Sequence, residues 1–274
     1  MSFTKDAVGV VRFIWSHPAN QGRRLRQLAS ATVFQAGARL FGRRRCVPIG
    51  HRGGRVWVAL RLGPATRVLY ANPPDWPQML VWERCLHPGD LFIDAGANVG
   101  TYSILCASLG AKVIAIEPAP DTIALLRENS QLNGDILDIR EQAVGSHEGS
   151  ITFTVGLGDV NHVAPNGGMV VPMTTLDAII GTRMVAGLKI DIEGYELEAL
   201  QGAARALRDH RIRVLQIEWN HLAPREPIAR LLADNGYSLF APTPTTCDDV
   251  FAAVGDDIPA LLQPVSPSGV MMQP

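Results

Sequence analysis

Cysteine is scarce in this sequence and shows no paired spacing. The 274 residues contain four cysteines, which lie far apart: Cys46, Cys85, Cys106 and Cys247. Separations of this kind fit neither a zinc site nor a disulfide framework. We therefore expect a protein of a reducing compartment, in which Cys106, within an apolar helical stretch, packs as a small hydrophobic residue.

Long hydrophobic runs are absent too, although 47% of the residues are hydrophobic. No stretch reaches the roughly 18 apolar residues that a membrane-spanning helix requires. The first 15 residues lack the layout of a secretory signal, because Asp6 and Arg12 interrupt their short apolar run. These absences predict a soluble, cytoplasmic protein with enough apolar residues for a substantial core.

The formal net charge is only −1, so no global charge favours a nucleic-acid partner. The charges are unevenly distributed, however. Residues 1–88 hold 14 Lys and Arg against 3 Asp and Glu, whereas residues 89–274 hold 11 against 23. This asymmetry predicts a basic N-terminal extension or cap over 1–88 and a second domain over 89–274. The basic part can meet an anionic partner, a membrane surface included, or can dock on the acidic part of its own chain.

Strand and helix patterns alternate along the second part. Apolar strands are expected at 91–95, 111–118, 136–145, 187–194 and 212–220, separated by helical stretches, with an added hairpin at 149–156. Such alternation predicts an α/β fold with a mostly parallel sheet and helices on both faces, whose ligands bind beyond the carboxyl ends of the strands. In the first part, residues 55–63 and 66–72 alternate like two strands.

A glycine-rich turn follows the first of these strands, with Asp94, Gly96, Asn98 and Gly100 at alternate positions. Glycine permits positive φ and a close approach of the backbone to a ligand. In the dinucleotide pattern G-x-G-x-x-G, a helix N-terminus binds a pyrophosphate. Asn98 departs from that pattern, and the Asp94 carboxylate would repel phosphates. A cationic ligand without phosphates fits better, and S-adenosylmethionine is one.

Glu117 ends the next strand, 23 residues after Asp94. A carboxylate there can accept hydrogen bonds from both hydroxyls of a ribose, in a nicotinamide cofactor as well as in S-adenosylmethionine. Gln142, on the third strand, can reach the adenine, or can simply be solvated at the strand end.

A second group of acids lies further along the chain. In the stretch 188–193 the charged residues Lys189, Asp191 and Glu193 alternate with apolar ones, which would place all three on one face of a strand. They can serve the ligand crevice or form an internal salt-bridge cluster. Glu218 closes the following strand, and His221 comes soon after it. Acids at neighbouring strand ends suit a general base, hydroxyl binding or an oxygen-ligand site for Mg²⁺. His162, in the loop 159–168, is a further candidate for proton transfer or substrate contact.

Four segments, in their order and spacing, resemble the FkbM-type methyltransferases: 90–133, 174–177, 188–203 and 214–218. That family consists of S-adenosylmethionine-dependent O-methyltransferases of the class I fold, which act on hydroxyls of sugars, polyketides or other natural products. The resemblance implies a seven-stranded sheet with Asp94, Gly96, Asn98, Gly100 and Glu117 around the cofactor. It also implies that Asp191 and Glu193 lie at the active site.

The sequence therefore predicts methyl transfer from S-adenosylmethionine to a hydroxyl of a sugar, glycan or natural product. Asp191 or Glu193 would accept the hydroxyl proton, and Glu218 or His221 would hold the acceptor. A nicotinamide-dependent oxidoreductase and a non-catalytic module that binds an adenosine ligand are the alternatives. The basic N-terminal part suggests an acceptor that carries negative charge.

Overall fold

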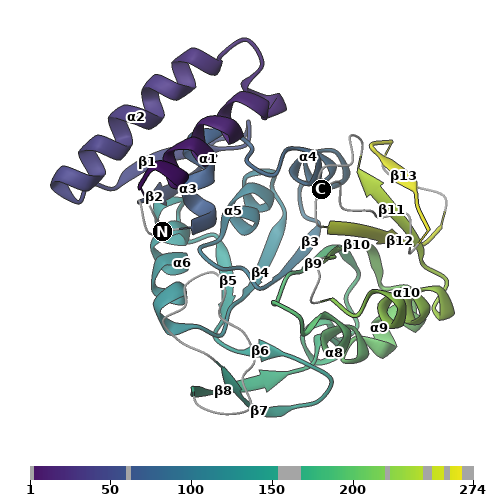
Figure 1. Cartoon of the computed structure of the whole chain (residues 1–274). Helices are drawn as coiled ribbons and strands as arrows, with labels where there is room; N and C mark the ends of the chain where they lie inside the picture. The colour runs from purple at the N-terminus through teal and green to yellow at the C-terminus, as the bar shows by residue number, and fades with distance from the viewer. Residues whose placement is uncertain are drawn as a thin grey trace.

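The computed structural model describes residues 3–59, 63–153, 168–219, 223–242, 249–255 and 260–266. A large central sheet lies between two layers of helices, and a pair of helices from the N-terminal part lies at one corner (Figure 1). This arrangement confirms the predicted α/β class with helices on both faces of a mostly parallel sheet. Among the described helices, none combines the length and the apolarity needed to cross a bilayer.

Within the described residues the central sheet has eight strands, one more than the seven implied by the resemblance. Their order across the sheet is β13 (Leu262–Pro264), β11 (Ser238–Pro242), β12 (Asp249–Ala253), β10 (Ile212–Glu218), β9 (Val185–Ile190), β3 (Leu91–Ala95), β4 (Lys112–Ile116) and β5 (Leu137–Arg140). The five strands from β10 to β5 are mutually parallel, whereas β12 and β13 run antiparallel to their neighbours. β3, β4, β5, β9 and β10 correspond to the strands expected from the sequence, whereas β12 and β13 were not expected.

Consecutive side chains of the central strands pack on opposite faces of the sheet. Phe92 belongs to one apolar cluster, and the next residue, Ile93, belongs to the other. The first face is covered by α4 (Trp76–Cys85), α5 (Thr101–Ser108) and α6 (Pro120–Leu132). The second is covered by α7 (Leu176–Ile180), α8 (Glu196–Gln201), α9 (Ala204–Arg208) and α10 (Arg225–Asp234). Burial on both faces explains why these strands are nearly continuous apolar runs.

Residues of the N-terminal part pack into the cluster on the first face. Its elements are α1 (Phe3–Ser16), the 3₁₀ turn η1 (Pro18–Asn20), α2 (Arg24–Phe41), the antiparallel pair β1 (Arg45–Ile49) and β2 (Gly54–Val58), and α3 (Gly63–Tyr70). Ile49 and Val56 of the hairpin share that cluster with Ile104 and Leu105 of α5. The N-terminal part therefore contributes to the same core as the sheet, whether or not it counts as a domain of its own.

The expected strand at 66–72 is wrong, because residues 63–70 form α3. Val68, Leu69 and Tyr70 are all buried, and α3 contacts β2 on one side and α1 and α2 on others. Three consecutive buried side chains can be accommodated by a helix surrounded by neighbours. In a strand, at least one of them would face away from a single packed surface.

A small second sheet lies beside the large one. It consists of β6 (Ala143–Val144), β8 (Met169–Thr174) and β7 (Gly149–Phe153), in that order. β7 supplies a strand within the expected hairpin stretch 149–156, but it pairs antiparallel with β8, at residues 169–174, and not with a strand inside that stretch. The expected third strand is divided: β5 belongs to the large sheet and β6 to the small one.

Candidate active site

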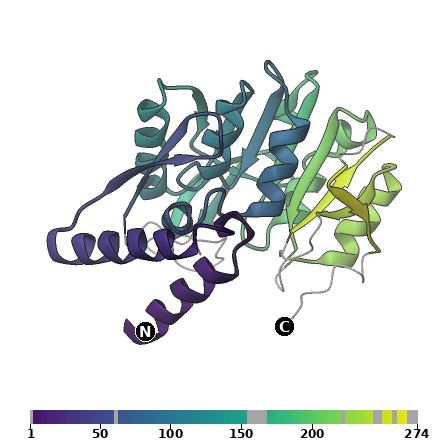
Figure 2. The ribbon, with the colours of Figure 1, turned by 90° about the horizontal axis from the view of Figure 1, so that it is seen from above.

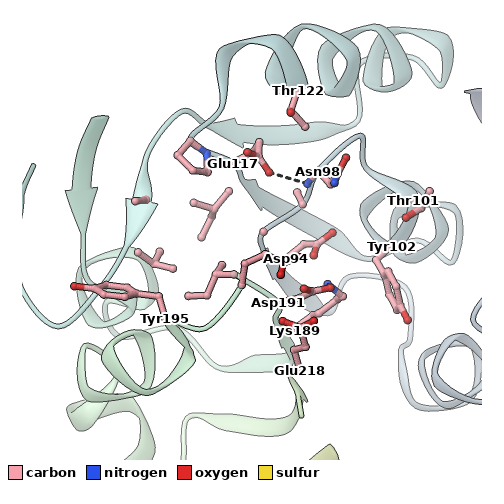
Figure 3. A pocket seen from close by; sticks show the side chains of 18 of the residues that line it. Asp94, Asn98, Thr101, Tyr102, Glu117, Thr122, Lys189, Asp191, Tyr195 and Glu218 are labelled. Atoms are coloured by element: carbon pink, nitrogen blue, oxygen red, sulfur yellow. Dashed lines mark hydrogen bonds and ion pairs between the residues drawn. The ribbon is translucent and has the colours of Figure 1, made fainter. Parts of the chain in front are cut away.

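A cavity of about 490 Å³ opens beyond the carboxyl ends of the central strands. β3 pairs with β4 on one side, to which it connects through α5, and with β9 on the other side. The strand order therefore reverses at β3. Crevices at such a reversal are where open parallel sheets bind ligands. The cavity thus lies where the sequence predicts it, and Figure 3 shows its lining.

The turn after β3 needs glycine for a reason within the chain itself. Gly96 and Gly100 have φ of +83° and +89°, and Asn98 has φ of +51°. A Cβ on Gly96 would overlap the carbonyl oxygen of Asp191, which follows β9. The sequence suggested that this glycine allows approach of a ligand. In the structure its missing side chain admits the backbone of the neighbouring strand end.

Asp94, the fourth residue of β3, points toward the cavity and is only 1% exposed. Its Oδ2 accepts a hydrogen bond of 2.6 Å from the hydroxyl of Ser103. Its Oδ1 is buried and has no hydrogen-bond partner among the described residues. Burial raises the pKa of Asp94, and the nearby ammonium group of Lys189 opposes that rise. A buried acceptor without a partner is costly, so this oxygen suits a donor or cation from a ligand.

Glu117 directly follows β4 and fixes the glycine turn. Its Oε2 accepts the backbone N–H of Asn98 at 2.9 Å (Figure 3), and its Oε1 accepts that of Ala119, also at 2.9 Å. Burial raises the pKa of Glu117 to about 7 against the effect of these two donors. Each carboxylate oxygen retains a further lone pair, so the group can still accept two hydroxyl donors.

An ion pair forms the floor of the cavity at the end of β9. The Lys189 ammonium group is buried, donates to Asp191 Oδ2 at 2.7 Å and lies 4.9 Å from the centre of the Tyr102 ring. Burial alone would lower the pKa of Lys189, but Asp191 and Asp94 outweigh it, so the pKa lies above its ordinary value. The predicted grouping of Lys189 with Asp191 is therefore present as a direct contact.

Glu193 reaches the cavity by a different route from the one expected. β9 ends at Ile190, and Glu193 has φ of +57°, in a turn beyond the strand. Strand alternation therefore does not extend to Glu193, and the turn brings it to the cavity instead.

Carboxylate oxygens of Asp191, Glu193 and Glu218 lie within 4.8 Å of one another. Burial, followed by the charges of Asp191 and Glu193, raises the pKa of Glu218 to about 9. Its Oε2 is buried without a hydrogen-bond partner among the described residues. Oxygen donors of this kind suit Mg²⁺, but acidic clusters also form without a metal, and Mg²⁺ stays a prediction.

Most of the residues selected from the sequence line this one cavity: Asp94, Gly96, Asn98, Glu117, Gln142, Asp191, Glu193 and Glu218. Gly100 instead caps the N-terminus of α5, and its missing Cβ makes room for Leu126. His221 and His162 lie outside the described residues. The roles assigned to individual residues stay predictions.

One wall of the cavity comes from the N-terminal part and was not predicted from the sequence. Arg67 of α3 and Asp75, just before α4, line it, and their charged groups are 4.0 Å apart. Burial raises the pKa of Asp75. Tyr102 of α5 and Tyr195 before α8 also line the cavity. The signal that could have pointed to this wall is an acid, Asp75, directly after two prolines in the stretch 72–77.

Comparison with known proteins now adds to this geometry. A family model described as the Methyltransferase FkbM domain matches residues 94–239, more than half of the chain. The chain belongs to the FkbM methyltransferase family. The resemblance seen in the sequence motifs is thereby confirmed, and the fold is the class I methyltransferase fold.

Individual relatives match over shorter regions. The hexuronic acid methyltransferase AglP of Haloferax volcanii is 32% identical over 135 residues, which cover 47% of this chain and 56% of that protein. The 23S rRNA (uracil(1939)-C(5))-methyltransferase RlmD of a Shewanella species is 40% identical over 70 residues, or 25% of this chain and 14% of that enzyme. The matches thus span little more than half of the first curated relative and a small part of the second.

Among solved structures, a precorrin-6Y C5,15-methyltransferase from Geobacter metallireducens aligns with a TM-score of 0.44 and 15% identity, covering 74% of this chain and 95% of that one. The magnesium protoporphyrin IX methyltransferase ChlM of Synechocystis aligns with a TM-score of 0.38 and 18% identity, covering 61% and 71%.

Proposed function

We propose that this protein transfers a methyl group from S-adenosylmethionine to a hydroxyl of a sugar or glycan. The observation that carries the proposal is the buried Oδ1 of Asp94, which lacks a partner among the described residues and shares one cavity with Glu117 and the acids Asp191 and Glu218. The membership of the chain in the FkbM family supports the reaction class.

The residues around the glycine turn fit S-adenosylmethionine. Asp94 Oδ1 would accept a hydrogen bond from the ligand's ammonium group, for which a carboxylate is a strong partner. Glu117 would accept both ribose hydroxyls with the lone pairs that the N–H groups of Asn98 and Ala119 leave over. Gln142, on the wall beyond Glu117, would face the adenine. When bound, the cofactor supplies a methyl group on a positively charged sulfur.

The other half of the cavity would hold and deprotonate the acceptor. Asp191 is fixed by Lys189, and its side chain is 36% exposed, so an acceptor in the cavity can reach it. Transfer of the methyl group from sulfur to the acceptor oxygen would release the hydroxyl proton, and Asp191 would take that proton. Glu218 keeps its own proton near neutral pH because its pKa is about 9, so it can donate a hydrogen bond to the acceptor. Glu193 is the second candidate for the base.

The charge of the cavity bears on the acceptor. Six carboxyl groups line it, and the cationic side chains among the described lining residues are Arg67 and Lys189. Lys189 is buried and in direct contact with Asp191. The Arg67 side chain, in contrast, is 62% exposed and its guanidinium lies 4.0 Å from Asp75, so a negatively charged part of an acceptor would bind near Arg67. Because the relative from Haloferax is a hexuronic acid methyltransferase, we propose a sugar whose carboxylate, where present, faces Arg67 and whose reacting hydroxyl faces Asp191.

Calorimetric titration tests the cofactor half of this proposal. S-adenosylmethionine and, separately, NAD⁺ are titrated into the wild type, Glu117→Ala and the control Glu141→Ala. Glu141 is an exposed acid that follows the neighbouring strand β5 and pairs with Arg127. We expect binding of S-adenosylmethionine alone, weakened about 10-fold or more by Glu117→Ala, because two hydrogen bonds to a charged group are lost, and unaffected by Glu141→Ala. Binding of NAD⁺ alone would favour the oxidoreductase alternative instead.

A methyl-transfer assay tests the acceptor half. Hexuronic acids and the matching neutral hexoses are incubated with the protein and S-adenosylmethionine labelled in the methyl group. We expect transfer to the hydroxyl oxygen, with Arg67→Gln raising KM for the uronic acid more than for the neutral sugar. Cofactor binding without transfer to any sugar of the panel would favour the non-catalytic module.

A further inference from the structure

The outward face of α2 is apolar along its whole length. Leu25, Ala29, Val33, Ala36 and Leu40 follow one another at intervals of three or four residues, and all five are exposed. The large side chains among them are 75%, 72% and 74% exposed at Leu25, Val33 and Leu40. The opposite face of the same helix packs into the core. A surface helix normally turns polar residues outward, so this helix has an additional apolar stripe that the fold of one chain does not use.

Helix α1 adds to this surface. Val8, Val11 and Trp15 lie at helical spacing and are exposed by about half or more. α1 and α2 lie together at the edge of the molecule, outside the layers that cover the sheet (Figures 1 and 2). We define the N-terminal apolar surface as Val8, Val11, Trp15, Leu25, Val33, Leu40 and Phe41.

The charges around this surface are predominantly positive, and Asp6, near the start of α1, is the one acid within the two helices. Residues 7–45 contain eight arginines and no aspartate or glutamate. Arg44 pairs with Glu128, and Arg12, Arg26 and Arg43 are exposed on or beside the two helices. Exposed leucine, valine and tryptophan next to arginine, with few acidic residues, is the composition of helices that lie in the headgroup region of a membrane.

We propose that α1 and α2 dock this protein on the surface of an anionic phospholipid bilayer. The apolar side chains would enter the boundary between headgroups and acyl chains, and the arginines would bind lipid phosphates and carboxylates. A second copy of the chain is a poorer occupant, because a symmetric contact through this surface would bring arginines of both copies together. The proposal concerns peripheral docking alone and does not depend on methyl transfer.

The two helices are firmly attached to the body of the protein. The His17 ring lies 2.7 Å from the carbonyl oxygen of Pro74, and Asn20 donates to the carbonyl oxygen of Tyr70 at 2.8 Å. Gln35 of α2 donates to the Tyr70 hydroxyl at 2.9 Å. The attached segment, 63–75, also provides the cavity wall with Arg67 and Asp75. Docking would therefore hold the cavity in a fixed orientation to the membrane.

Vesicle sedimentation tests the proposal with the full chain. The probes are phosphatidylcholine vesicles with and without phosphatidylserine. The apolar variant is Leu25→Ser, Val33→Ser and Leu40→Ser, and its control is Ile136→Ser, Val170→Ser and Met184→Ser, which changes three exposed apolar side chains elsewhere. A charge variant, Arg12→Gln, Arg26→Gln and Arg43→Gln, tests the contribution of the arginines to binding. Circular dichroism and thermal unfolding verify that each variant keeps its fold.

We expect the wild type to bind the phosphatidylserine vesicles about 10-fold or more tightly than pure phosphatidylcholine, and to be released by salt. The apolar variant and the charge variant should each lose about 10-fold in affinity, whereas the control should bind like the wild type. Equal binding by the apolar variant and the control would overturn the proposal. The proposal would also be overturned if the wild type failed to bind vesicles and instead formed a concentration-dependent dimer that the apolar variant does not form.

Discussion

Lys189 is the residue that links the two halves of the cavity. Its ammonium group donates to Asp191, and both Asp191 and Asp94 raise its pKa. The group is buried, so removing either carboxylate leaves a poorly compensated charge in the protein interior. Asp94 belongs to the half with the glycine turn and Asp191 to the half with the acids, so one cation fixes groups from both.

Replacing Asp191 tests the proposed base. Asp191→Asn keeps an oxygen that can accept from Lys189 but cannot take a proton near neutral pH. We expect turnover to fall at least ~10-fold while the affinity for S-adenosylmethionine changes only a few-fold, since general-base catalysis contributes about 10²–10⁴-fold. Single-turnover methyl transfer and calorimetry measure the two quantities. Asp209→Asn, at an exposed ion pair, is the control, and unchanged turnover in Asp191→Asn would remove this residue from the mechanism.

The candidate site could be predicted from the sequence where it lies at strand ends. Asp94, Glu117 and Asp191 were found because parallel strands bring their carboxyl ends to one edge of the sheet. Arg67 and Asp75 were missed because they belong to the segment whose helix was interpreted as a strand. Their approach to the cavity depends on long-range packing of α3, which no local pattern encodes.

At the scale of elements, α4 is held to the sheet by one large side chain. Trp82 is fully buried, lies edge-on to Phe92 with ring centres 5.0 Å apart and donates its indole N–H to Gln216. Gly187 of β9 leaves the space for its ring, because a Cβ there would lie 2.5 Å from a ring carbon of Trp82. α4 lies within residues 1–88, so this packing joins the N-terminal part to the sheet.

We expect Trp82→Ala to lower the free energy of unfolding by about 3–5 kcal/mol, the usual cost of removing a buried aromatic side chain. Urea unfolding followed by circular dichroism measures it, and the loss should appear within one cooperative transition because the N-terminal part and the sheet share a core. Trp15→Ala, at a half-exposed position, should cost less than about 1 kcal/mol. A separate early transition of the N-terminal part would contradict the shared core.

The order of elements followed from the sequence wherever strands and helices alternate. Residues 91–132 were predicted nearly as observed, because apolar strands buried on both faces and glycine-bounded helices give strong local patterns. α3 was not predicted. Valine, leucine and tyrosine occur in both kinds of element, and the neighbours that favour the helix come from α1, α2 and β2.

At the scale of the whole molecule, carboxyl groups in and near the cavity make stability depend on pH. Burial, with neighbouring acids, raises the pKa of Glu117 and Asp249 to about 7 and that of Glu218 to about 9. The folded protein therefore keeps protons that the unfolded chain releases near its ordinary carboxyl values. Stability must then fall as pH rises from the ordinary values toward 7, and further toward 9 through Glu218.

We expect the melting temperature of the ligand-free protein to be higher near pH 6 than near pH 9. Glu218→Gln cannot titrate, so it should reduce the decrease between pH 7 and 9 by at least about 2 °C. Differential scanning calorimetry across this range measures the effect, with Glu226→Gln, an exposed acid, as the control. An identical pH profile in Glu218→Gln would show that this residue does not carry the raised pKa.

Gly96 and Asp191 have a consequence for anyone who wishes to redesign this protein. Their backbones touch where no side chain fits, so the segments 94–100 and 191–194 form one rigid unit built from two distant parts of the chain. Libraries that vary these segments will mostly yield unfolded chains. The wall with Arg67 and Asp75 stands on a separate helix and turn, and diversification there is the better starting point for new acceptors.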